Sequence, residues 1–248
     1  MWLINSSIGR KVVMSVTGIA LILFLTFHCC MNIVALFSAE GYNMICEFLG
    51  ANWYAVVATL GLAALAVCHI VFAFILTAQN RKARGENRYE VSTTVNNNGL
   101  FDVAERWASS NMLVLGLIIL VGLLIHLQNF WYNMMFAEIV GMPTQLSPTD
   151  GFGWIQETFA NPVLVVIYLV WFCAIWFHLA HGFWSAMHTL GMSGKIWQKR
   201  MQCIGLVYVT LLMLGFAVVV LGFAFGCAPS LDCCGAAECC KEAAACCQ

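Results

Sequence analysis

Charged side chains are scarce in this 248-residue chain: they make up 9% of it, against the roughly one quarter that is usual in soluble domains. Hydrophobic residues make up 62%, and the mean hydropathy is +0.85. These values exclude a soluble globular domain and indicate an integral membrane protein, embedded in a lipid bilayer. The net charge of -1 gives no indication of nucleic-acid binding.

Lys and Arg are missing from two loops, 38–52 and 131–161, and ten of the eleven basic residues fall on the opposite side of a five-helix topology. Because basic residues collect on the cytoplasmic side, we expect the N-terminus in the cytoplasm and the C-terminus outside. The predicted fold is an all-α integral membrane protein, a helix bundle. Its five transmembrane helices are expected at about 12–37, 53–77, 112–130, 162–189 and 204–225.

The first apolar segment could also be a secretory signal peptide, since it follows Arg10 and Lys11. Its length and the poor cleavage sequence at 37–39 favour a retained helix. Residues 1–226 then form the transmembrane domain, and 227–248 form a tail that holds seven of the 13 cysteines. We expect this tail to lie outside and to be poorly ordered; disulfides, a bound metal or an extension without a role all stay open for it.

Four consecutive predicted helices carry one histidine each at a similar distance from their start. At about 1.5 Å per residue, His28 lies about 24 Å into a helix that starts inside. His126 lies at a similar outer depth in the third helix. His69 and His178 lie as deep in helices that start outside, so both are expected near the inner face. Chain direction therefore sorts the histidines into an outer pair and an inner pair.

An imidazole in hydrocarbon is costly unless something binds it, so histidines within a membrane are candidate functional residues. Two imidazoles from two helices at one level have the geometry of bis-histidine ligation of a haem iron, and two such pairs make a haem ladder. Hydrogen-bonded packing is the alternative, but four matched depths favour ligation. A zinc or copper site needs three or four protein ligands at one level, whereas a macrocycle supplies four of its own.

His181 lies three residues after His178, on the same helix face. It could hydrogen-bond a haem propionate or replace His178 as a ligand, and a packing or interfacial histidine is the alternative. Glycines within the predicted helices could admit flat macrocycles, or could simply allow close helix packing. These glycines are Gly18, Gly61, Gly116, Gly122 and Gly182.

Recognisable motifs surround the histidines. They are the segment SIGRKVVMSVTG ending at Gly18, Phe27-His28, Cys68-His69, His126 in the third apolar segment, and FHLAHG beginning at Phe177. Over roughly residues 5–225, the chain resembles the dihaem cytochrome b subunit of succinate:quinone oxidoreductases (succinate dehydrogenase or fumarate reductase), the membrane anchor with five helices in a single chain.

In that family one histidine on each of the first four helices ligates haem, and the first helix pairs with the third and the second with the fourth. The resemblance therefore implies that His28 and His126 bind the outer haem b, and that His69 and His178 bind the inner one. The fourth-helix ligand of the family is followed four residues later by a glycine, which selects His178, with Gly182, over His181.

The resemblance also implies partners. A flavoprotein subunit with FAD and an iron–sulfur subunit would dock on the cytoplasmic face of a bacterial inner membrane, and the whole complex could dimerise. This chain would be the quinone-reactive subunit, which exchanges electrons with menaquinone near the outer haem, while succinate and fumarate are interconverted elsewhere. Glu47 lies near the place where some relatives hold an acidic residue that takes up quinol protons, and a solvated loop glutamate is the alternative. Trp176 replaces a glutamate that certain relatives use for proton conduction, so the chain departs from that route.

Two other interpretations stay open. A dihaem cytochrome b that serves a hydrogenase, a formate dehydrogenase or a nitrate reductase would share the haem ladder and differ in its fourth-helix pattern. A metal transporter would use the histidines and the Cys-rich tail, but the helices lack the charged residues that commonly line cation paths.

Overall fold

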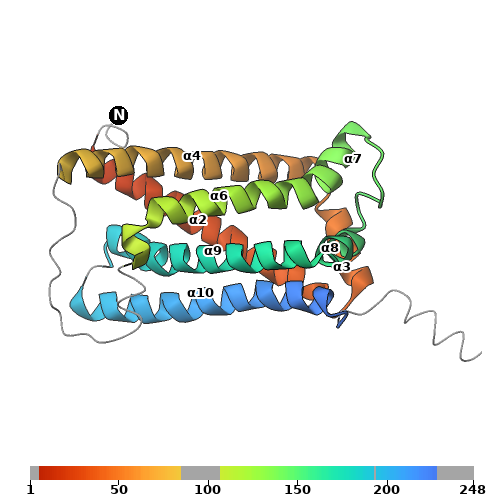
Figure 1. Cartoon of the computed structure of the whole chain (residues 1–248). Coiled ribbons are helices and arrows are strands. Elements are labelled where there is room, and N and C mark those ends of the chain that lie inside the picture. Colours follow the sequence, from red (N-terminus) through yellow and green to blue (C-terminus); the bar gives the residue numbers. More distant parts are fainter. Residues whose placement is uncertain (1–5, 85–106, 193, 228–248) are drawn as a thin grey trace, which may run out of the picture. The chain divides into compact units, whose positions relative to one another are not determined.

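A computed structural model describes residues 6–84, 107–192 and 194–227, and over these residues the chain is helical and has no strand (Figure 1). Five helices are long and apolar enough to cross a membrane, which confirms the predicted all-α class and the five spans. Which end faces the cytoplasm stays a prediction. The long helices are α2 (Ser7–Val34), α4 (Trp53–Arg84), the continuous run of α6 (Met112–His126), η1 (Leu127–Phe136) and α7 (Ala137–Val140), then α9 (Pro162–Thr189) and α10 (Lys195–Ala224).

The helices extend beyond their apolar parts. α4 continues past the predicted end at 77 to Arg84, and α10 begins at Lys195 rather than at 204. Hydropathy marks the part of a helix that fits the bilayer, whereas Ala, Gln, Lys and Arg continue a helix well into water. α2 begins before the predicted 12, at Ser7, and the Ser6 hydroxyl accepts a hydrogen bond from the Gly9 N–H at 2.9 Å.

Two short helices occupy stretches that the sequence predicted to be loops. α3 (Ala39–Phe48) begins after Ser38, and α8 (Gly151–Phe159) begins after Asp150. Each of these two capping side chains accepts a hydrogen bond from a backbone N–H of the first helical turn, as N-cap residues do. α3 and α8 pack against one another.

The third long helix changes its winding directly after His126. Residues Leu127–Phe136 form a π-helix, a rare conformation that occurs most often at functional sites. The predicted end of this helix at 130 is therefore too early, since the helix continues to Val140 and ends at Gly141. Gly141 takes the left-handed conformation (φ 67°) that favours glycine after a helix.

Contacts between residues divide the chain into two units, and the predicted single transmembrane domain stays a prediction. The predicted tail lies, from residue 228, outside the described residues. The first unit consists of Met1–Thr26, Val57–Leu123 and Trp171–Met213, and the second of Phe27–Val56, Leu124–Val170 and Leu214–Gln248.

Candidate functional site

In the second unit, the imidazoles of His28 and His126 lie against one another. Their ring centroids are 5.8 Å apart and their planes meet at 86°. His28 lies in α2, and His126 is the last residue of α6, where the π-helix begins. The ring of Phe216 from α10 lies 5.8 Å from that of His28, and the ring of Tyr168 from α9 lies 6.2 Å from that of His126. Four long helices thus contribute to the surroundings of this pair.

In the first unit, His69 of α4 lies opposite His178 of α9. Their centroids are 6.4 Å apart and the planes meet at 62°. The Thr17 hydroxyl of α2 lies 3.1 Å from Nδ1 of His69. Glycines leave space beside both rings: a Cβ on Gly18 would lie 3.2 Å from Cε1 of His69, and one on Gly116 would lie 4.0 Å from Cε1 of His178.

The other glycines behave differently. A Cβ on Gly122 would overlap the indole of Trp171, whose Nε1 donates to the carbonyl oxygen of Ile119 at 3.1 Å. The space beside Gly122 is therefore filled by the Trp171 side chain. Nothing lies within 4 Å of a Cβ built on Gly61 or Gly182.

The first unit also holds polar atoms that are buried and unsatisfied. Nδ1 of His178, Nδ1 of His181 and Nε1 of Trp184 have no hydrogen-bond partner within the described part of the chain. A buried polar atom without a partner costs about 1–3 kcal/mol, so a group that accepts or replaces these hydrogen bonds would stabilise the site. The rings of His181 and Trp184 lie 5.4 Å apart, and it is His178, not His181, whose ring contacts that of His69.

The spacing of each pair fits one shared metal ion. An ion bound by two imidazole nitrogens at about 2.0 Å each separates the ring centroids by roughly 6 Å, and the two pairs show 5.8 and 6.4 Å. Within residues 6–84, 107–192 and 194–227, no group of three or more His, Cys, Asp or Glu side chains is arranged to hold a bare ion. Haem supplies four ligands of its own, so two imidazoles suffice for it.

No protein-family model, no curated protein and no solved structure matches the chain. The family resemblance of the sequence motifs therefore stays a prediction.

Glu47 lies at the end of α3, and its side chain is exposed. It belongs to the same unit as His28 and His126. An exposed carboxylate can exchange protons with water, which both the proposed catalytic role and the simple solvated glutamate require.

The sequence did not predict a polar connection that begins at His28. The Asn32 amide donates to the carbonyl oxygen of His28 at 2.8 Å, and the Tyr42 hydroxyl donates to Oδ1 of Asn32 at 3.2 Å. Burial, and then the neighbouring Cys46, raise the pKa of Tyr42 well above its usual value. Burial also raises the pKa of the Cys46 thiol to about 11. Both groups therefore stay protonated at neutral pH, and the Tyr42 hydroxyl keeps the proton that it donates to Asn32. Tyr42 and Cys46 lie in α3, and the sequence feature that could have predicted this helix is its N-cap residue, Ser38.

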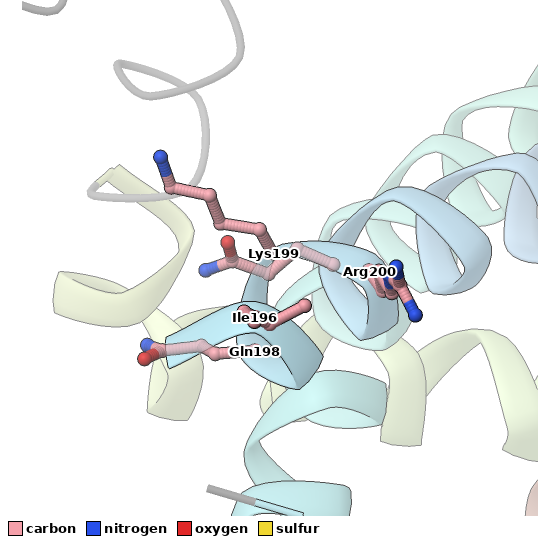
Figure 2. A pocket seen from close by; sticks show the side chains of 5 residues that line it. Ile196, Gln198, Lys199 and Arg200 are labelled. Carbon is pink, nitrogen blue, oxygen red and sulfur yellow. The ribbon is translucent and has the colours of Figure 1, made fainter. Parts of the chain in front are cut away.

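An open hollow lies at the start of α10 (Figure 2). All its lining side chains come from about two turns of this helix, and Figure 2 shows the Lys199 side chain extending away from the ribbon. The Arg200 guanidinium lies 5.6 Å from the centroid of the Trp197 ring. This surface belongs to a basic stretch that the sequence predicted to be cytoplasmic. The lining residues are Ile196, Gln198, Lys199, Arg200 and Gln202.

Proposed function

We propose that this chain is a dihaem cytochrome b that carries electrons within a membrane, as the anchor subunit of a succinate dehydrogenase or fumarate reductase. The observation that carries the proposal is the pairing of four histidines from four different long helices. Each pair has close to the ring separation that one ligated iron requires. A bound haem b would accept and release one electron at a time.

The chain itself would hold and surround the two haems. His28 and His126 would ligate one iron, and His69 and His178 the other. The long helices offer almost no charged side chains near these positions, which keeps the surroundings apolar and excludes water. The buried N–H groups of His181 and Trp184 could donate to a haem propionate, which would remove the cost of leaving them unsatisfied.

The sequence motifs and the charge distribution support the wider role. A flavoprotein subunit with FAD and an iron–sulfur subunit would dock on the cytoplasmic face of a bacterial inner membrane, where basic residues such as Lys199 and Arg200 are expected. Menaquinone would exchange electrons near His28 and His126. Glu47, exposed and in the same unit as this pair, is the candidate that would pass protons between quinol and water.

A reduced-minus-oxidised optical spectrum of the purified chain, with haem quantified against protein, tests the proposal. We expect two b-type haems in the wild-type chain, one in His28→Ala and one in His69→Ala. His188→Ala is the matched control, because His188 lies in the last turn of α9 and belongs to neither histidine pair, and this variant should retain two haems. A folded wild-type chain without haem would overturn the proposal, and tightly bound zinc or copper would then favour metal transport. Loss of both haems from one folded variant would overturn the pairing.

The partner enzyme is identified by the subunits that purify with the chain from its native membrane. Succinate-dependent reduction of the haems would support the proposed complex. Reduction by hydrogen or formate instead would assign the chain to another respiratory complex.

A further inference from the structure

We infer that Thr17 positions His69 as an iron ligand and sets the redox potential of the haem held by His69 and His178. This inference rests on the proposed function and adds a residue to it that touches neither iron nor substrate. Thr17 acts through the imidazole of His69, so it is a positioning residue.

Thr17 and Gly18 together hold one edge of the His69 ring. The Thr17 hydroxyl oxygen lies 3.1 Å from Nδ1, and Thr17 is only 5% exposed, so water does not compete for this contact. The neighbouring Gly18 brings bare backbone to the same ring, since a Cβ there would lie 3.2 Å from Cε1 and 3.7 Å from Nδ1. The hydroxyl and the missing side chain thus fix both the direction and the position of the imidazole.

The acceptors around Thr17 favour one placement of the protons. Its Oγ1 lies 2.9 Å from the carbonyl oxygen of Val13 and 3.1 Å from that of Met14, so the single hydroxyl proton has a backbone acceptor. We assign Oγ1 as the acceptor of a hydrogen bond from Nδ1–H of His69, because in this tautomer both protons have an acceptor. Because a neutral imidazole carries one ring proton, Nε2 of His69 keeps its lone pair and is the nitrogen free to bind iron.

The two ligands of this pair are therefore unequal. Nδ1 of His178 is buried and has no hydrogen-bond partner among the described residues. A hydrogen bond from Nδ1–H to an acceptor makes an imidazole more basic, and a more basic ligand favours the oxidised iron. Thr17 therefore lowers the potential of this haem relative to the same site without the hydroxyl.

Potentiometric titration of the haem absorbance in the purified full chain tests the inference. Thr17→Val keeps the branched shape and removes the acceptor, whereas Thr17→Ser keeps the hydroxyl. Thr26→Val is the matched control: Thr26 is also on α2, also donates to the carbonyl oxygen four residues back (Ile22, 2.8 Å), and contacts Tyr208 instead of a histidine. The spectrum of His69→Ala identifies which of the two potentials belongs to this pair.

We expect Thr17→Val to raise the potential of the haem held by His69, or to empty that site, without a shift in the other haem. Thr17→Ser and Thr26→Val should leave both potentials at their wild-type values. If Thr17→Val does not fold, Thr17→Ala carries the same expectation. Unchanged potentials, or a shift common to both haems or to Thr26→Val, would overturn this inference and leave the proposed function standing. A folded wild-type chain without haem would overturn both.

Discussion

At Gly18, the addition of a single methyl group should affect one haem site and leave the other unchanged. In Gly18→Ala the new Cβ would lie 3.2 Å from Cε1 of His69, closer than ordinary contact, and the helix backbone cannot move away freely. The ring must shift or tilt, so we expect a lower haem content and a changed spectrum for the His69–His178 site. Changes to the groups that orient a metal ligand commonly lower the affinity for the metal by roughly 10- to 100-fold. Haem quantified against protein measures the effect.

The matched control is Gly61→Ala, on α4 like His69 itself. Nothing lies within 4 Å of a Cβ on Gly61, and alanine is favoured over glycine in a helix by about 1 kcal/mol. This variant should keep two haems and unfold no earlier than the wild-type chain. Normal haem content in Gly18→Ala, or equal losses in both variants, would show that the ring does not depend on the space at Gly18.

The contacts of single residues were predictable only where they depend on depth in the membrane. Counting along the helices was enough to bring His28 to His126 and His69 to His178, because the rise per residue is constant. The contact between Thr17 and His69 depends instead on how α2 is rotated about its axis. A helix with apolar residues on all sides gives no sequence signal for that rotation.

Among the elements, the long helices were predictable from their apolar length, while the short helices and the π-helix were not. The acidic residues of 38–52 and 131–161 suggested loops, yet α3 and α8 form there because Ser38 and Asp150 cap them. The π-helix after His126 has no simple sequence signature. It changes the direction of every later side chain in that helix, including Asn129, whose amide donates to the Tyr168 hydroxyl at 3.2 Å.

The contact between α3 and α8 should depend on one side chain, Asn43. Its amide nitrogen donates to Asp150 at 2.8 Å, and its amide oxygen accepts from the Phe152 N–H at 2.8 Å. Asn43→Ala removes both bonds and leaves the start of α8 without them, a loss of about 1–3 kcal/mol. We expect faster hydrogen exchange in α8, measured by mass spectrometry, with little change in the long helices.

Asn111→Ala is the control for Asn43→Ala, because the Asn111 amide donates to a nearby backbone acceptor, the Trp107 carbonyl oxygen at 2.8 Å, and not to α3 or α8. Exchange in α8 should be unaffected by this change. Equal exchange in α8 for the wild-type chain and Asn43→Ala would mean that apolar packing, and not Asn43, joins the two short helices.

For the whole molecule, the charge distribution makes a prediction that the histidine geometry does not. Two helices that could cross a membrane separate Arg81 and Lys82, at the end of α4, from Lys199 and Arg200, in the first turns of α10, so we expect all four on one side. The stretches with α3 and α8 carry only acidic charges, and the number of crossings predicts them on the other side. The positive-inside rule then assigns the basic side to the cytoplasm.

Reporter fusions at two loops test this orientation. Alkaline phosphatase, which is active only outside the cytoplasm, should be active when fused after Thr149 and inactive when fused after Gly191; green fluorescent protein should give the opposite pattern. The reverse result at both sites would mean that the chain has the opposite orientation in the membrane. His28 would then still pair with His126 and His69 with His178, because each pair is defined by contacts within one unit. In the proposed complex, the partner subunits would then dock on the side of the His28–His126 pair, and the quinone would react near His69 and His178.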